Sequence, residues 1–437
     1  MDRKNRFVLV ASLSLVVLIV GLKTAELVLS MDAPSANDAD LVLVRREVPE
    51  DQNALPILEE AGKKVDIPYD DRSELEESLA GKAWDEAKVD GLFCRNAEAL
   101  ALLRQGMARP DFLYPPRRGL MDCADYVPWM HLGNLACLNA LRLHRQGDDA
   151  AAFEEAMRVV RFGRRAMGGQ GTLVTFLLGQ AIREDGLAAL RRMLPECRLE
   201  SSRLAACGRD LSAAGSAWAD LADALRGEYA TNAGVIEDLS QGKPTGADTG
   251  GRRSPALGFL LQVNRTKGMI AEEMRPAIEN AGRPYAAMVW PPRRVVFREG
   301  EDQRVPADGL SALEAFATGN GIGKLVFAAM SQDNRSHLKC CCQYDVSATA
   351  TRVLVALRAY RTEKGDLPRL LDELVPTYME AVPRDAFDGA PLRYDRSKKV
   401  VYSVGENLTD DGGEGPAYDA GQVKEDNPKD LVFPIAF

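Results

Sequence analysis

The sequence predicts a mainly α-helical protein: a helical bundle or a stack of helical hairpins that follows one N-terminal transmembrane helix and precedes a small C-terminal α+β domain. Three observations predict this class. Residues 7–22 are uncharged and apolar, residues from about 130 to 230 repeat leucines at helical spacing, and two short segments within 392–404 have strand composition. A chain of 437 residues is long enough for about two or three domains.

Composition excludes several classes of protein. Hydrophobic residues make up 46% and charged residues 27% of the chain, which is typical of globular proteins and not of disordered, collagen-like or polytopic membrane proteins. The net charge of -9 repels phosphate backbones, so we expect no nucleic-acid partner. The three histidines, His131, His144 and His337, are too few to favour a histidine-built metal site or catalytic triad.

The first 30 residues are expected to form a short cytoplasmic N-terminus and a transmembrane anchor. The run at 7–22 would span about 24 Å as a helix, and continuing it to Leu29 reaches the roughly 30 Å of a hydrocarbon core. Lys23 and Glu26 fall in the last turns, where their charges can reach the headgroups.

Flanking charges predict the orientation of this anchor. Arg3, Lys4 and Arg6 precede the apolar run, whereas only Lys23 follows it closely, so the positive-inside rule places the N-terminus in the cytoplasm. The expected location is the bacterial inner membrane, with the bulk of the chain facing the periplasm. The alternative is a cleaved signal peptide, but the run does not end in an A-x-A pattern, so a retained anchor is favoured.

Residues 31–46 are small, polar and acidic, which indicates a linker, and 47–240 are expected to form a helical domain. A helical hairpin is predicted around Gly147, which supplies a stop, with Asp148 or Asp149 capping the next helix. Further helices are expected at about 172–194 and 200–230.

Four glycines and two prolines within 241–255 predict a linker or long loop over 241–256. Residues 257–346 are expected to be a helical segment with an extended arm at about 294–304. Helix is expected again from Ser311, with interruptions between Gly323 and Lys364, and a C-terminal domain over 347–437.

No catalytic motif is found in the sequence, so a non-enzymatic protein is expected. The glycine-rich 319–324 segment fails the phosphate-loop spacing, and Leu325 occupies the position of the magnesium-binding hydroxyl. Glu184 lies on the apolar face of its helix and is expected to pair with a nearby arginine. Neighbours within Cys340 to Cys342 point about 100° apart on a helix, so we expect no bridge between them.

The C-terminal region has a specific order of motifs. A helix with the pattern A-L-R-x-Y ends at Gly365, a short helix is expected at 370–375, and Asp388 with Gly389 forms a turn. Strands are expected at 392–394 and 400–404, joined by a hairpin at 395–398 and followed by a loop rich in glycine and aspartate.

These motifs, together with L-V-P-x-Y, P-x-D-x-F-x-G and a G-G-E-G loop, resemble the globular domain of the major pseudopilins of type II secretion. The resemblance covers about a fifth of the chain and implies protein–protein contacts. Pseudopilins have a hydrophobic helix after a glycine–glutamate leader site, whereas here the apolar run precedes Gly21. The whole arrangement of anchor, helical body and pseudopilin-like end is similar to membrane-anchored envelope proteins of planctomycete-type bacteria.

The pseudopilin resemblance also implies calcium in the terminal loop. Residues 405–437 contain eight acidic residues against two lysines, which accounts for six of the nine excess negative charges. Calcium takes six to eight oxygen ligands from carboxylates and carbonyls in tight loops. Asp419 has the family's spacing from the glycine-rich turn, and Asp410, Asp411 and Asn407 are the candidates for the preceding ligands. The alternative is a solvated acidic loop without an ion.

We therefore expect a membrane-anchored extracytoplasmic scaffold or binding protein with protein partners and no cofactor other than calcium. One alternative is a component or adaptor of a type II secretion or pilus-like machine. Another is an extracytoplasmic enzyme, for which the sequence offers no constellation of catalytic residues.

Overall fold

The computed structural model describes residues 31–35, 37–116, 127–213, 215, 217–243, 261–291, 295–297, 304–306, 320–418 and 429–437. Its helices are α2 (Leu55–Lys63), α3 (Tyr69–Leu79), α4 (Glu86–Ala108), α5 (Val127–Arg145), α6 (Asp149–Met167), α7 (Leu173–Met193), α8 (Ser201–Ala213), α9 (Trp218–Ser240), α11 (Val263–Asn280), α13 (Gly321–Met330) and α14 (Asn334–Lys364). Short 3-10 turns are η1 (Ala39–Leu41), η2 (Leu194–Glu196), η3 (Tyr285–Ala287) and η4 (Leu371–Leu374).

Two small antiparallel sheets accompany the helices. The first pairs β1 (Val295–Phe297), which lies in the arm predicted at about 294–304, with β2 (Arg304–Pro306), which begins at the end of that arm. The second has the order β3 (Arg393–Asp395), β4 (Val400–Ser403), β5 (Leu431–Pro434). The hairpin of β3 and β4 was predicted. Strand β5 was not predicted, because its four residues alone do not show the alternation of a strand.

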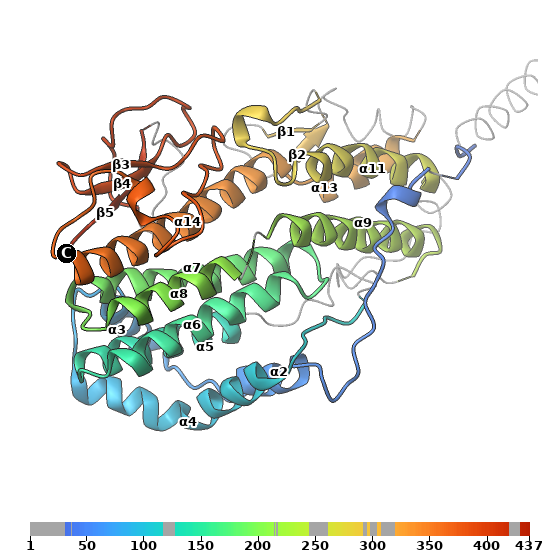
Figure 1. Ribbon diagram of the computed structural model, residues 1–437. Coiled ribbons are helices and arrows are strands. Elements are labelled where there is room, and N and C mark those ends of the chain that lie inside the picture. Colours follow the sequence, from blue (N-terminus) through green and yellow to red (C-terminus); the bar gives the residue numbers. More distant parts are fainter. Residues whose placement is uncertain are drawn as a thin grey trace, which may run out of the picture.

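The helices lie roughly side by side, from α4 on one face of the molecule through α5, α6 and α7 to α14 (Figure 1). The β3–β4–β5 sheet lies beyond α14, at the end of the molecule that holds the C-terminus (Figure 1). The predicted mainly helical class with a small C-terminal sheet is therefore confirmed for the described residues.

The predicted α5–α6 hairpin is present with its expected turn chemistry. Gly147 has φ of 85°, a left-handed conformation that glycine adopts without steric cost. Asp148 is the N-cap, and its carboxylate accepts the Ala151 N–H at 3.0 Å. At the end of α14, Gly365 has φ of 85° and stops the helix as predicted.

Glycines allow α6 and α7 to pack backbone against backbone. A Cβ atom added at Gly163 would lie 2.4 Å from the Arg183 amide nitrogen and 2.4 Å from the Gly179 carbonyl oxygen. A Cβ at Gly186 would lie 2.8 Å from the Val160 nitrogen. No side chain fits into such a contact, so these glycines set the distance between the two central helices.

Helix α14 contributes to the two largest hydrophobic clusters of the described residues. Its first turns, with Leu338 and Cys341, pack into a cluster formed by α7, α9, α11 and α13. Its remaining residues, from Cys342 to Ala359, belong to a larger cluster that includes helices α2 to α8 and the C-terminal sheet. The predicted boundary between 346 and 347 lies inside this continuous helix.

One predicted helix is divided in the structure. The segment expected as a single helix over about 200–230 forms α8 and α9, which are separated by Gly215 with φ of 69°. A left-handed residue cannot continue an α-helix, so the chain turns there. The prediction was wrong because the apolar spacing on either side of Gly215 is helical and conceals the break.

Two further predictions fall wholly or largely outside the described residues. The transmembrane anchor over 1–30 is outside them, and most of the loop at 241–256 is also outside them. Within the part of the chain that is described, no helix combines the length and the apolar character that crossing a membrane requires.

Because of the close contact between α6 and α7, alanine substitutions at two helical glycines should change the free energy of unfolding in opposite directions. Gly163→Ala should lower the free energy of unfolding by about 1–3 kcal/mol, because the added methyl group pushes α6 and α7 apart. Gly268→Ala on α11, where a Cβ meets nothing within 4 Å, should raise it by up to about 1 kcal/mol. Urea unfolding followed by circular dichroism measures both. Equal shifts for the two variants would contradict the close contact.

Candidate functional site

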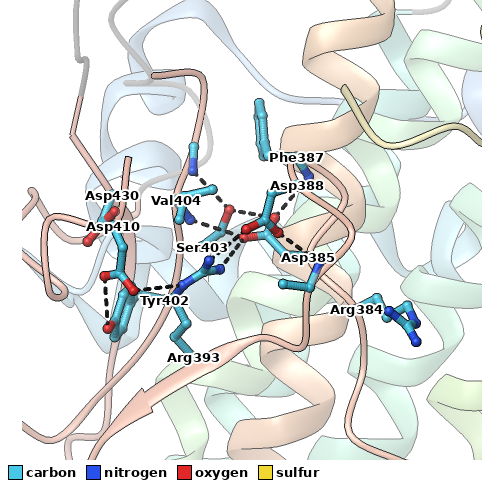
Figure 2. Close-up of polar contacts among 12 residues, drawn as sticks. Arg384, Asp385, Phe387, Asp388, Arg393, Tyr402, Ser403, Val404, Asp410 and Asp430 are labelled. Atoms are coloured by element: carbon cyan, nitrogen blue, oxygen red, sulfur yellow. Dashed lines mark hydrogen bonds and ion pairs between the residues drawn. The ribbon is translucent and has the colours of Figure 1, made fainter. Parts of the chain in front are cut away.

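The most concentrated polar site of the C-terminal unit surrounds Arg393 on β3 (Figure 2). Its guanidinium contacts three carboxylates: Nη2 lies 2.6 Å from Asp388, Nε 3.0 Å from Asp410, and Nη1 3.3 Å from Asp385. Asp385 and Asp388 come from the turn before β3, whereas Asp410 comes from the terminal loop. One arginine therefore joins the turn, the sheet and the loop.

Asp385 is the buried end of this network. It is 1% exposed, and its carboxylate accepts the Phe387 N–H at 2.9 Å, the Val404 N–H at 3.0 Å and the Ser403 hydroxyl at 2.8 Å. Burial raises the pKa of Asp385 above its usual range, although these hydrogen bonds act in the opposite direction. A carboxylate with this many donors is a structural anchor for the β4 end of the sheet.

A second buried carboxylate, Asp430, organises the terminal loop. It is fully buried directly before β5, and it accepts the Gly413 N–H at 2.7 Å and the Asp411 N–H at 3.3 Å. Burial raises the pKa of Asp430, and the two amides oppose that rise. The loop is therefore folded around an acid that accepts hydrogen bonds from its backbone.

The structure divides the predicted calcium ligands into separate groups. Asn407 donates its side-chain amide to Asp411 at 3.0 Å, so these two lie together on the exposed part of the loop. Asp410 instead faces Arg393 and accepts the Tyr402 hydroxyl at 3.2 Å. Asp419 lies outside the described residues. Within the described ranges, His, Cys, Asp and Glu side chains form no group of three or more suited to a metal ion.

Basic side chains of the protein already contact this loop. Burial raises the pKa of Asp410, but the Gly412 amide and Arg393 outweigh it and hold that pKa below its usual range. Lys398 donates to the Gly412 carbonyl at 2.7 Å. Asp410 and the Gly412 carbonyl are the oxygen types that calcium prefers, and each has a cationic partner from the β3–β4 hairpin.

Sequence reasoning missed Arg393, Asp385, Asp388 and Asp430 as members of this site. A partial signal was available, because Asp385 lies in the P-x-D-x-F motif and Asp430 directly precedes the apolar run of β5. An acid next to a buried strand must find hydrogen-bond donors. The sequence did not show which of eight loop acids would be buried.

A second polar cluster joins α7 to α14 and confirms the pairing expected for Glu184. Glu184 Oε1 lies 2.6 Å from Arg191 Nη2 and accepts the Ser347 hydroxyl at 2.8 Å. Arg191 also donates to the Thr351 hydroxyl at 2.7 Å. Glu184 is 2% exposed and Ser347 is fully buried, so the cluster lies in the interior between α7 and α14.

Cys340, Cys341 and Cys342 are free thiols in the structure, and no bridge joins neighbours among them. Burial raises the pKa of Cys341 and of Cys342, which disfavours the thiolate that metal binding and redox chemistry require.

Comparison with protein-family models, with curated proteins and with solved structures finds no match to this chain.

The Arg393 network predicts a large difference between two arginine substitutions. Arg393→Met should lower the free energy of unfolding by about 3–5 kcal/mol near neutral pH, because it leaves the buried Asp385 and its neighbours without their cation. Arg396→Met is the matched control. It removes an exposed pair with Asp366, and it should cost no more than about 1 kcal/mol.

A second substitution tests the cause of that loss. Adding Asp388→Asn to Arg393→Met removes one of the unpaired carboxylates and should recover part of the lost stability. Chemical unfolding of all four proteins measures these effects. A double variant no more stable than Arg393→Met would contradict charge repulsion as the cause.

Proposed function

We propose that the protein is a membrane-anchored extracytoplasmic scaffold or binding protein, with its anchor within residues 1–30 in the bacterial inner membrane and its body in the periplasm. The observation that supports this most is the position of the two ends. The segments 32–35 and 37–45 run along one end of the helical body, and the β3–β4–β5 sheet lies at the other (Figure 1).

The chain that follows the proposed anchor is attached to the body from its first residues. The Asp32 carboxylate accepts the Asn264 N–H at 2.7 Å and the Arg265 N–H at 3.1 Å, at the start of α11. Asp40 pairs with Arg275 at 2.8 Å, further along the same helix. The body would therefore be held close to the bilayer in one orientation, with the C-terminal unit directed away from it.

The C-terminal unit offers apolar contacts to a protein partner. Leu370 is 63% exposed and Leu408 is 41% exposed, and both belong to this unit. The unit packs on α14 within the main core, so its surface has a fixed orientation relative to the helices. A rigid surface held away from a membrane is a suitable design for presenting or positioning another protein.

A second candidate, an adaptor or component of a type II secretion or pilus-like machine, is favoured by the order of elements. Helix α14, the turn η4 and the antiparallel β3–β4 hairpin follow one another in the order that the pseudopilin resemblance implies. Co-purification of the full-length protein with pseudopilins or a secretin distinguishes this candidate from a general scaffold.

The proposal predicts the accessibility of the segment after the anchor. In a Cys94→Ser background, Ser35→Cys should react with a membrane-impermeant maleimide in intact spheroplasts, because Ser35 is exposed and lies on the periplasmic side. Asp2→Cys should react only after the membrane is permeabilised. The opposite pattern would place the body in the cytoplasm and exclude the proposed location.

We further propose that the terminal loop binds calcium through Asn407, Asp410, Asp411 and Asp419. The ion would replace Arg393 as the partner of Asp410 and would relieve repulsion between the carboxylates. At a hundredfold excess over Kd, binding should stabilise the full-length protein by about 2.7 kcal/mol and raise its melting temperature by a few degrees. Asp419→Ala should remove most of this gain, and magnesium should not replace calcium. Identical melting curves with calcium and with chelator would show that the loop holds no ion.

A further inference from the structure

A cavity of about 260 Å³ lies at the end of the body that is opposite to the C-terminal sheet. Its walls come from the chain between Asp38 and Arg45, from residues 115–116, from the turn before α7 and from α9. Much of the lining is apolar, with side chains from Leu41, Val42, Leu43, Pro115 and Pro116. Its size is close to the lower end of small-molecule sites.

Arg45 is the cationic group in this lining, and its charge is not neutralised. Its guanidinium donates to two backbone carbonyls, that of Gln170 at 3.1 Å and that of Tyr114. No carboxylate among the described residues pairs with it. Burial lowers the pKa of Arg45, but an arginine remains charged at neutral pH. A guanidinium has five N–H donors, so some remain for a ligand.

Asp38 is the acidic residue in the same lining, and unlike Arg45 it already has polar side-chain partners. Asp38 accepts the Tyr229 hydroxyl at 2.5 Å and lies 3.8 Å from the Lys267 ammonium. The unbalanced charge of the cavity is therefore positive, and it lies beside hydrocarbon walls.

We propose that this cavity binds an alkyl chain with an anionic head group, a carboxylate or a phosphate monoester, with the anion paired to Arg45 and the chain against the apolar walls. Charge pairing in a partly desolvated site strengthens a bidentate arginine contact. Val42 is 63% exposed where it lines the cavity, so apolar surface continues from the interior to the solvent. This inference concerns the end of the molecule opposite to the proposed protein-binding unit. Its test rests on the proposed membrane anchor, whose failure is recognised separately because the protein would then not enter the nanodiscs.

The test uses the full-length protein in nanodiscs of zwitterionic lipid, titrated calorimetrically with hexanoate, heptanoate and octanoate against empty nanodiscs. Affinity should increase about fourfold for each added methylene, which is the transfer free energy of about 0.8 kcal/mol per buried methylene. Octanol and octylamine should bind at least about tenfold more weakly than octanoate, because neither pairs with Arg45. Absence of octanoate binding, or equal affinity for the three head groups, overturns the proposal.

Two substitutions test separately the contribution of the Arg45 charge and the contribution of the cavity volume to binding. Arg45→Met should abolish the preference for octanoate over octanol. Ala230→Trp should abolish binding of both, since Ala230 is an exposed α9 residue that lines the cavity and a larger side chain there fills it. Ala101→Trp, at an exposed position on α4, is the control and should bind as the unmodified protein does. Unchanged octanoate binding by Ala230→Trp overturns the proposed site even if Arg45→Met fails to fold.

A third arm identifies the source of the ligand. In nanodiscs that contain anionic phospholipid, weaker apparent binding of octanoate that persists at high salt, where repulsion by the membrane surface is screened, identifies membrane lipid as a competing occupant of the same site. An unchanged affinity identifies a free anionic amphiphile as the ligand. Both results support the proposed chemistry, whereas octanoate binding that Ala230→Trp does not remove contradicts it in either membrane.

Discussion

The structure depends most on the buried ion pair of Glu184 and Arg191 on α7 and on the two hydroxyls that α14 supplies to it. Removing an ion pair from water costs several kcal/mol per ion, and only good geometry with further hydrogen bonds offsets that cost. Ser347 donates to Glu184, and Ser347 and Thr351 both accept from Arg191, so the required partners come from a helix more than 150 residues further along the chain. The pair is stable only while α14 lies in this register against α7. The register of the two helices is therefore fixed by electrostatics as well as by apolar packing.

The need to hold α14 in register against α7 explains the distribution of buried residues on α14, which lie on more than one side of the helix. Ser347 and Thr351 face α7, while Val353 and Leu357 belong to the main core that also includes the C-terminal sheet. A helix covered on several sides cannot show a simple amphipathic stripe. Because α14 is enclosed in this way, the C-terminal unit is part of the body and not an appendage on a linker. Arg191 extends the same connection, since its guanidinium lies 5.8 Å from the ring centroids of Tyr418 and Phe433 in the terminal segment.

Features set by neighbouring residues could be predicted from the sequence, and features set by distant residues could not. The Gly147 turn, the Asp148 cap, the Gly365 stop and the β3–β4 hairpin each depend on a few consecutive residues, and each was predicted. The close contact at Gly163 depends on Gly179 and Arg183 of another helix, and nothing in the local pattern distinguishes it from an ordinary helical glycine.

The site around Arg393 was missed because it too depends on residues that are distant in the sequence. An arginine on a strand gives no sign of its partners when they lie both before it, at Asp385, and after it, at Asp410. The candidate ligands Asn407 and Asp411 are four residues apart and do lie together.

The same geometry determines how the two ends of the protein can influence each other. Helix α7 begins beside the cavity, directly after its N-cap Thr172, and its 21 residues extend about 30 Å toward the terminal segment whose Tyr418 and Phe433 rings contact Arg191. Coupling between sites at such a separation requires an element with two alternative arrangements. A rotation or shift of α7 would separate Glu184 and Arg191 from Ser347, leaving buried charges without their donors, and it would also have to overcome the backbone contact at Gly163. Moving α7 from its observed position, by rotation or by a shift, therefore costs free energy. An anionic ligand at Arg45 and a protein at the C-terminal unit would then bind to one rigid body without altering each other's affinity, which is the behaviour of a scaffold and not of an allosteric switch.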